Sequence, residues 1–273
     1  MKLNKVLVIY KHHVGGGKAS ERLATSQRAG KKHRRAITTV AQVLKERGIG
    51  FTLKGRSHFK RPAKADLIIS VGGDGTAIAA AHFARNIPVL GVNSMPGHSV
   101  GFFCSATPKT LGHSLKKIIR GIAKPKSLPL IETRINGKKI PILALNDILF
   151  ASASPAETAR YSIFVGKLRE MQKSSGVWVA AGPGSTAAIA SAGGRKMPIN
   201  SDTLQFVVRE PYIQRGKKLR LLGGNIKRGE KIKIISGTQD GMIFIDGPKT
   251  AYTVPFGGKV EVRVSGKKLR IFL

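Results

Sequence analysis

The residues whose types and spacing most clearly suggest chemistry are five in a row, Gly72-Gly73-Asp74-Gly75-Thr76. They follow the apolar run Ala65–Val71 and precede the alanine-rich run Thr76–Ala84, so they should form a loop between a strand and a helix. Glycines in such a loop let the backbone approach a phosphate closely, and the N-terminus of the following helix attracts anions. A carboxylate in that position would repel phosphate, so we expect it to have a chemical role of its own.

Asp74 has two chemical interpretations and one structural interpretation. Its carboxylate could be a general base that activates a hydroxyl group, or a ligand for a Mg²⁺ ion that bridges phosphates. It could instead only cap the following helix in a tight turn. Both chemical interpretations indicate phosphoryl transfer, but this motif alone does not choose among kinase families.

Two further segments place polar groups where a site could lie. Asn146-Asp147 interrupts the apolar run Pro141–Phe150, which is costly inside a sheet unless the pair lies at a bulge or faces a site. A bend that faces solvent is the alternative. Gly182-Pro183-Gly184-Ser185-Thr186 predicts a turn into a helix that runs to Ala192, with Ser or Thr as its cap. By itself, this last segment indicates a cap rather than a site.

The first half of the chain alternates short apolar runs with helical patterns, which predicts an open parallel sheet with flanking helices. Residues 12–35 form a Gly- and Lys-rich stretch that we interpret as a loop or the approach to a helix. The predicted strands are Val6–Tyr10, Phe51–Leu53, Ala65–Val71 and Ile87–Val92, and the predicted helices are Ala36–Arg47, Thr76–Ala84 and Pro108–Ile122.

The pattern changes after Lys124-Pro125-Lys126, from where strands separated by turn signals dominate. We therefore predict an α/β domain over residues 1–124, carrying the Gly-Gly-Asp-Gly-Thr loop, and a mostly antiparallel β-sandwich-like domain over 125–273. The strands predicted in the second domain are Leu128–Ile135, Lys138–Phe150, Tyr161–Val165, Trp178–Ala180, Gln205–Arg209, Lys231–Ile235, Met242–Ile245, Val260–Val264 and Lys268–Phe272.

The charge balance is unusual, with 48 Lys plus Arg against 14 Asp plus Glu. Such a surface attracts polyanions, whether nucleic acid, anionic lipid, nucleoside triphosphate or polyphosphate, although a basic bias shared by a whole proteome gives the same balance. No apolar run is long enough to span a bilayer. The single cysteine, Cys104, fits a reducing cytoplasm, and neither it nor the scattered histidines has the spacing of a metal site.

Four blocks occur in an order that resembles the NAD kinase family. They are the Gly-Gly-Asp-Gly-Thr loop; Gly91-Val92-Asn93 followed by Ser99-Val100-Gly101-Phe102-Phe103; Ala144-Leu145-Asn146-Asp147; and Ser175 to Ala187, continued by Ser191-Ala192-Gly193-Gly194. The last two blocks are similar to the family's ALNE or ALND block and to its signature ending in GSTAY and SAGG. The resemblance covers Lys5 to about Gly247.

This resemblance implies that the chain transfers a phosphoryl group from ATP, or from polyphosphate, to the 2′-hydroxyl of the adenosine ribose of NAD. It implies Mg²⁺ or another divalent cation with the ATP, an α/β domain joined to a β domain with NAD between them, and a homo-dimer or homo-tetramer. Asp74 would be the catalytic base. The residues implied to bind NAD are Gly73, Asp74, Gly75, Phe102, Asn146, Asp147, Thr186, Ala187 and Ser191, and those implied to contact phosphate are Gly72, Gly73, Gly75 and Thr76, with Thr76 capping the helix.

Some positions depart from the family pattern. Ser175 replaces the usual aspartate and Ala188 the usual tyrosine, so we expect sparser contacts to the nicotinamide half of the dinucleotide. Two alternatives remain: a lipid kinase of the diacylglycerol or sphingosine kinase type, disfavoured by Ser185 to Gly194, and a non-enzymatic polyanion-binding protein, disfavoured by the intact Asp74. We expect a cytoplasmic protein without membrane insertion or a specific nucleic acid partner. The basic cluster Lys31–Arg35, with Lys11, Lys18 and Arg28 nearby, predicts that polyphosphate serves as a donor.

Overall fold

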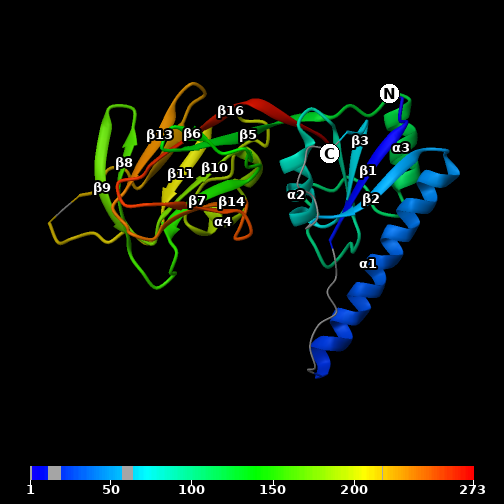
Figure 1. The fold of residues 1–273 in the computed structure, drawn as a ribbon, viewed down its shortest axis with the longest axis horizontal. Coiled ribbons are helices and arrows are strands. Elements are labelled where there is room, and N and C mark those ends of the chain that lie inside the picture. Colours follow the sequence, from blue (N-terminus) through cyan, green and yellow to red (C-terminus); the bar gives the residue numbers. More distant parts are fainter. Residues whose placement is uncertain (1, 12–19, 57–63, 217) are drawn as a thin grey trace. The chain divides into compact units, whose positions relative to one another are not determined.

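The chain forms two compact units, each described here by itself (Figure 1). The computed structural model describes residues 2–11, 20–56, 64–216 and 218–273, with residues 20–27 as backbone only. The first unit comprises Met1–Ser127 and Leu269–Leu273, and the second comprises Leu128–Lys268. The sequence-based division assigned all of 125–273 to the second domain, whereas the last five residues group with the first unit because they pair with its sheet.

The first unit is built on a parallel sheet in the strand order β2-β1-β3-β4. Its strands are β1 (Lys5–Tyr10), β2 (Gly50–Gly55), β3 (Leu67–Gly72) and β4 (Val89–Asn93), and the end of β16 (Lys259–Phe272) pairs in parallel with β4. Every residue of β3 and β4 is buried, as expected when both faces of a parallel sheet are covered. The carboxyl ends of both strands therefore lie in the interior of the strand order, where the loops that follow them can bind a ligand.

Among the described residues of this unit, three α-helices accompany the sheet: α1 (Ser20–Glu46), α2 (Asp74–Ala84) and α3 (Leu111–Ile119). The prediction that the first helix begins at Ala36 was wrong, since α1 begins at Ser20. Its buried positions continue the helical period back from Ala36 through His33 and Gly30. An imidazole and a glycine carry no apolar signal, so the hydrophobic pattern could not reveal this part of the helix.

The second unit packs two antiparallel sheets around one core that includes Phe150, Tyr161, Phe206, Ile232 and Val262. One sheet has the order β12-β11-β10-β7-β14-β15, formed by β7 (Asp147–Ser152), β10 (Val177–Ala180), β11 (Leu204–Val208), β12 (Gly223–Ile226), β14 (Gly241–Ile245) and β15 (Ala251–Val254). The other has the order β16-β13-β8-β9, with β13 (Lys231–Ser236), β8 (Ala159–Val165) and β9 (Leu168–Ser174), and β16 also pairs with β5 (Lys126–Ile135), which pairs with β6 (Lys138–Lys139). The predicted mixture of an α/β unit and a mostly antiparallel β unit is confirmed.

Several strands of the second unit differ from the prediction. β9, β12 and β15 were missed; β9 buries the polar Gln172 and Ser174, and so lacks an alternating apolar pattern. The predicted strand Lys138–Phe150 is interrupted before β7, and the two strands predicted in 260–272 form the single strand β16. The helix predicted to run to Ala192 is only a 3-10 turn at Gly182–Gly184 and a short α4 (Ala188–Ser191).

Candidate functional site

Asp74 lies at the carboxyl end of β3, at the first position of α2. Gly73 is the residue before the helix, and no side chain caps the helix there. The backbone N–H of Phe103 donates a hydrogen bond of 2.8 Å to Oδ1 of Asp74. The carboxylate is therefore held by the loop that contains Phe103, and the interpretation of Asp74 as a helix cap is wrong. A carboxylate in the first turn is also stabilised by the helix dipole.

Close packing explains two of the three glycines of the loop, Gly72 and Gly73. A Cβ added to Gly72 would lie 2.3 Å from Oγ1 of Thr76, and one added to Gly73 would lie 3.1 Å from Oγ of Ser99. The Thr76 side chain is buried behind Gly72, so the expectation that it caps the helix is wrong. Gly75 is exposed, and its carbonyl accepts a hydrogen bond from Arg56. The loop thus presents a backbone edge without side chains, as phosphate binding requires.

Asn93, at the end of β4, shapes the neighbouring loop. Its Oδ1 accepts hydrogen bonds of 3.0 Å from the Met95 N–H and from the Ser99 hydroxyl, and its Nδ2 donates to the Ser99 carbonyl. Gly101 has φ +65°, and a Cβ there would lie 2.5 Å from Nδ2 of Asn93. Asn93 therefore stabilises the loop that brings the Phe103 N–H to Asp74. Asn93 belongs to one of the blocks that resemble the NAD kinase family, but the sequence did not reveal this structural role of its side chain.

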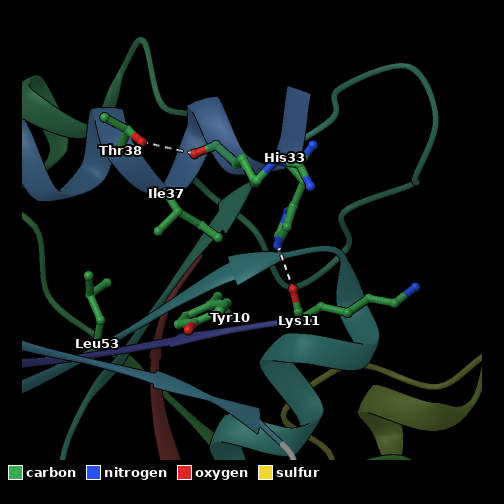
Figure 2. Close-up of a pocket in the computed structure, with 7 residues that line it drawn as sticks. Tyr10, Lys11, His33, Ile37, Thr38 and Leu53 are labelled. Carbon is green, nitrogen blue, oxygen red and sulfur yellow. Dashed lines mark hydrogen bonds between the residues drawn. The ribbon is translucent and has the colours of Figure 1, made fainter. Parts of the chain in front are cut away.

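His33 connects α1 to the residues that follow β1 and β4, and Figure 2 shows its hydrogen bond to the Lys11 carbonyl. Its Nε2 lies 2.9 Å from the Lys11 carbonyl, and its Nδ1 lies 2.9 Å from Oγ of Ser94. Because a carbonyl only accepts, Nε2 donates the hydrogen bond to Lys11, while Nδ1 and the Ser94 hydroxyl share the second hydrogen bond. The Ser94 N–H in turn donates to the Gly72 carbonyl at 3.1 Å. His33 thereby positions the segment next to the Gly-Gly-Asp-Gly-Thr loop.

A cavity of about 350 Å³ lies beside His33 in the first unit (Figure 2). Its lining includes the cationic side chains of Lys11 and Arg34. In the predicted basic cluster Lys31–Arg35, His33 points inward and the other members are exposed on α1. Arg28 is also exposed, while Lys18 lies outside the described residues. The cluster is therefore a surface of the helix rather than a loop.

Cys104 lies beside the loop but is not suited to nucleophilic chemistry. Its thiol is partly buried, 4.0 Å from the Gly72 carbonyl. Burial and then the negative charge of Asp74 raise the pKa of this thiol to about 12. Since the thiolate is the reactive form, Asp74 is the reactive group that this loop offers.

A second group of predicted residues is organised by Asp246 in the second unit. Its carboxylate accepts three backbone hydrogen bonds, from Leu145 and Asn146 at 2.8 Å and from Asp147 at 3.1 Å. Asp246 has φ +50°, a left-handed conformation typical of a turn. The sequence did not reveal Asp246 as a functional residue, because nothing local indicates that its side chain orders a segment a hundred residues away.

Asp147 is 5% exposed and opens β7. Burial, and then the negative charge of Asp246, raise the pKa of its carboxyl to about 7. Within the described part of the chain, no donor lies within hydrogen-bond distance of its carboxylate. A buried carboxylate next to another carboxylate is typical of functional sites, because it weakens folding unless a ligand uses it.

Asn146 offers a buried acceptor that the described residues leave unsatisfied. Its Oδ1 has no hydrogen-bond partner among them. The Gly182–Gly184 turn packs directly on this residue: the Ala181 N–H donates to the Asn146 carbonyl at 3.0 Å, and a Cβ on Gly184 would lie 2.1 Å from it. A ligand donor is one way to satisfy such an acceptor.

The remaining predicted residues differ in exposure. Thr186 and Ser191 are exposed, and Ala187 is half-buried. The prediction that Ser or Thr caps the helix was wrong, since Ala187 precedes α4 and no side chain caps it. The Ser185 hydroxyl instead holds the turn, donating to the Gly182 carbonyl at 2.8 Å and accepting from the Met197 N–H. Phe102 is 43% exposed and lies edge-on to Phe103. Its ring is therefore available to a ligand.

The structure thus brings the predicted residues together in two groups. Within the first unit, Asp74 lies with its neighbouring loop residues and the Phe102-Phe103 segment. Within the second unit, Asn146 and Asp147 lie beside the turn that leads to Thr186 and Ala187. In the described residues, no three His, Cys, Asp or Glu side chains form a group that could hold a metal ion. Across those same residues, no helix is long and apolar enough to cross a membrane.

Comparison with known proteins identifies relatives over nearly the whole chain. The family model for the ATP-NAD kinase N-terminal domain matches residues 7–123. A probable NADH kinase of Oryza sativa subsp. japonica is 34% identical over 264 residues, covering 88% of this chain and 81% of the relative. An NAD kinase of Thermoplasma volcanium is 30% identical over 207 residues, covering 76% and 73%.

The fold is also similar to that of a solved structure. The crystal structure of an NAD kinase from Archaeoglobus fulgidus in complex with ATP superposes with a TM-score of 0.73 at 22% identity, covering 98% of this chain and 93% of that one. None of these comparisons supports a lipid kinase or a non-enzymatic protein. With a relative of 34% identity over most of both sequences, the chain belongs to the NAD kinase family.

Proposed function

We propose that this protein transfers the γ-phosphoryl group of ATP to the 2′-hydroxyl of the adenosine ribose of NAD, giving NADP and ADP. The observation that carries the proposal is the placement of Asp74. Its carboxylate lies at the carboxyl end of a buried parallel strand, at a helix N-terminus, in a loop whose glycines expose the backbone. Ligands of open α/β sheets bind at this edge.

In the proposed mechanism, Asp74 acts as the general base. The hydrogen bond from the Phe103 N–H fixes Oδ1, and Oδ2 accepts no hydrogen bond from the described residues. Oδ2 takes the proton of the ribose hydroxyl as that oxygen attacks the γ-phosphorus and the bond from phosphorus to the ADP oxygen breaks. The proton then passes to solvent. The glycine backbone and the N-terminus of α2 favour the negative charge of the phosphates.

The second group of residues would hold the dinucleotide. The unsatisfied Oδ1 of Asn146 and the buried carboxylate of Asp147 are acceptors, which suits the hydroxyl groups of a ribose. The exposed ring of Phe102 would pack near the adenine, which Thr186, Ala187 and Ser191 would also line. Gly73 and Gly75 would contact the phosphates of the dinucleotide.

A divalent cation fits this site only as part of the ATP complex. The described residues contain no cluster of three His, Cys, Asp or Glu, and Asp74 is the single carboxylate of the loop. Mg²⁺ usually keeps several waters and binds to substrate phosphates, so it would enter with the phosphates of ATP and leave Asp74 free to act as the base. When bound, Mg²⁺ would screen the phosphate charge.

NADH is a second candidate acceptor. The rice relative is named a probable NADH kinase. The chemistry also differs at the two positions that depart from the family pattern. The Ser175 hydroxyl donates a hydrogen bond to Glu210, and Ala188 has no aromatic ring. These departures concern the nicotinamide half, where NAD and NADH differ, so both acceptors belong in the assay.

The test is NADP or NADPH formation by purified protein with Mg²⁺ and ATP, measured with an NADP-specific dehydrogenase. Asp74→Asn should lower kcat by about 10²–10⁴-fold, the usual contribution of a positioned base, while calorimetry shows NAD binding largely unchanged. Asp240→Asn, which removes an exposed carboxylate, is the control. Near-normal kcat for Asp74→Asn would show that the base is another group.

We also propose that the protein is a homo-oligomer, dimer or tetramer, and acts in the cytoplasm. The support is the family resemblance and, for location, a single cysteine that forms no intrachain disulfide. Light scattering after size-exclusion chromatography tests the oligomer, and a monomeric mass would contradict it. Fractionation of cells that express the full chain tests the location.

A further inference from the structure

One face of the second unit gathers cationic side chains from neighbouring strands. On β13 and β16, apolar residues point inward at every second position and charged residues alternate with them on the outer side. We name this surface the basic face. Its cations are Arg134, Lys139, Arg160, Arg169, Lys173, Lys231, Lys233, Lys259 and Arg263, and its carboxylates are Glu132 and Glu261.

The strand register shows that these cations are direct neighbours. Lys231 lies opposite Arg263 between β13 and β16, and Arg160 lies opposite Lys173 between β8 and β9. Like charges directly opposite each other destabilise a sheet. An anion bound across the strands would relieve that repulsion.

The two carboxylates of the basic face are already engaged. Glu132 is buried and accepts from Lys139, from Arg263 at 2.6 Å and from Arg134 at 3.3 Å. Glu261 pairs with Lys231 at 2.6 Å and Lys259 at 3.1 Å. Each carboxylate therefore holds two or three cationic side chains beside it but neutralises only one positive charge.

The remaining cations lie toward β8 and β9. Within the described chain, no carboxylate lies within ion-pair distance of Arg160, Arg169, Lys173 or Lys233. Lys233 lies opposite Glu261 of β16, outside ion-pair distance, while Arg160, Arg169 and Lys173 lie on β8 and β9, so this part of the basic face carries an excess of positive charge.

Aromatic and apolar side chains lie between these cations. Phe164 sits on β8 between Lys233 and Arg169, with Nζ of Lys233 3.9 Å and Cζ of Arg169 5.3 Å from its ring centroid. Nζ of Lys173 lies 4.7 Å from the ring centroid of Tyr212, which is 55% exposed. Met171, on the same side of β9 as Arg169, is 77% exposed. Planar and polarisable groups therefore alternate with cations along a sheet edge.

We propose that the basic face binds single-stranded nucleic acid without sequence preference, as a function separate from phosphoryl transfer. Its cations would contact successive phosphates, and the Tyr212 ring and the Arg169 guanidinium would stack on bases. Single-strand binders combine these two features, a positive track and exposed stacking groups. Part of the positive charge of the chain would then serve to bind nucleic acid.

Other occupants fit the basic face less well. Inorganic polyphosphate has phosphates but no base to stack on Tyr212. A membrane would require a contiguous apolar surface, whereas Met171 and Tyr212 are single groups separated by cations. A second copy of the chain would bring the same positive charge against itself.

The first experiment separates the basic face from the overall charge. Binding of a fluorescein-labelled 20-nucleotide RNA of mixed sequence is measured by anisotropy across a salt series. The variant Arg160→Gln/Arg169→Gln/Lys173→Gln/Lys233→Gln should bind at least tenfold more weakly at low salt. Its salt slope should be shallower by about 2 units, since each phosphate contact to a single strand contributes about 0.7 and Arg160, Lys173 and Lys233 are the three phosphate contacts removed.

The matched control is Lys45→Gln/Lys116→Gln/Lys117→Gln/Arg120→Gln, which removes the same charge from exposed positions of the first unit. It should keep RNA binding within about threefold and change the slope by less than 1 unit. If both quadruple variants lose affinity equally, the binding reflects diffuse charge and the proposal is wrong. Circular dichroism and NADP formation should be unchanged in both, so failure here leaves the proposed kinase function untouched.

The second experiment distinguishes nucleic acid from other polyanions. Tyr212→Leu should weaken RNA binding by roughly 5- to 100-fold, the range expected for one lost stacking contact, and leave binding of polyphosphate unchanged. Phe256→Leu, at another exposed ring of the same unit, is the control and should have no effect. Equal RNA affinity of the Tyr212→Leu variant, or tighter binding of polyphosphate or phosphatidylserine vesicles at equal phosphate concentration, would overturn the proposal.

Discussion

Replacing Asp147 with Asn should make the second unit more stable at alkaline pH and change how its stability depends on pH. Asp147 is 5% exposed beside the carboxylate of Asp246, and its pKa is raised from 3.8 to about 7 by burial and by that charge. In the unfolded chain, the carboxyl ionises near its ordinary pKa. Ionisation of Asp147 therefore favours the unfolded state.

The magnitude follows from the displacement of the pKa. One pKa unit corresponds to about 1.4 kcal/mol, so a displacement of about three units corresponds to roughly 4 kcal/mol. The direction of the pH dependence follows because the pKa of the Asp147 carboxyl is higher in the folded state than in the unfolded chain. Its contribution to stability is fully present below about pH 4 and is lost as the pH rises through about 7. Asparagine cannot ionise, so Asp147→Asn should be more stable than the parent protein at pH 8.5 by up to this amount.

The assay is urea unfolding followed by the fluorescence of Trp178, the single tryptophan, between pH 4.5 and 8.5. Trp178 lies on β10, so its signal reports the unit that contains Asp147. Asp240→Asn, on the surface of the same unit, corrects for the general effect of removing a carboxylate. If Asp147→Asn keeps the pH slope of the parent protein, the carboxyl ionises freely in the folded state and the reasoning is refuted.

Three further predictions follow from the site and the charge. Asn146→Ala should raise the KM for NAD by the loss of a hydrogen bond, roughly 1–3 kcal/mol, and unchanged NAD affinity by calorimetry would place Asn146 outside the site. Burial alone would raise the pKa of Glu132, but hydrogen bonds from Lys139, Arg263 and Arg134 lower it to about 2. Glu132→Gln should therefore destabilise the second unit by roughly 3–5 kcal/mol above pH 4.5, less as the pH falls toward 2, and a pH-independent loss in urea unfolding would contradict the ion-pair origin. Polyphosphate should serve as a donor at low salt at least as well as ATP, with kcat/KM falling more steeply with salt; equal salt slopes would exclude the exposed cations of Lys31–Arg35 as a donor track.

The elements around Asp74 were predictable because two physical constraints act locally. The buried strands β3 and β4 read as continuous apolar runs, and the glycine loop marks the point where the chain must turn closely against Thr76. The start of α1 was not predictable, because its inward positions include Gly30 and His33. Strand β9 was not predictable for the same reason, since its buried side chains Gln172 and Ser174 are polar; the Ser174 hydroxyl hydrogen-bonds to that of Tyr161.

The candidate site was predictable where the chemistry lies in one segment and not where distant segments cooperate. Asp74 and Asn146 were found by residue type and by resemblance. Asn93 and Asp246 were missed, because each acts through hydrogen bonds to the backbone of another segment. Asp246 reaches across 100 positions of sequence to hold Asn146, and no local pattern encodes such a contact.

If the polar groups of the second unit bind NAD as proposed, they would link NAD binding to protons. Among the described residues, the buried Oδ1 of Asn146 has no hydrogen-bond partner, and burial and the charge of Asp246 raise the pKa of the Asp147 carboxyl to about 7. If Asp147 accepts a ribose hydroxyl, as proposed, the ligand favours the ionised carboxylate and lowers its pKa. NAD binding should then release a proton near neutral pH and tighten as the pH rises from 6 to 8. Calorimetry in buffers of different ionisation enthalpy measures that proton directly. Asp147→Asn should abolish its release, and proton uptake by the parent protein would show that NAD does not donate to Asp147.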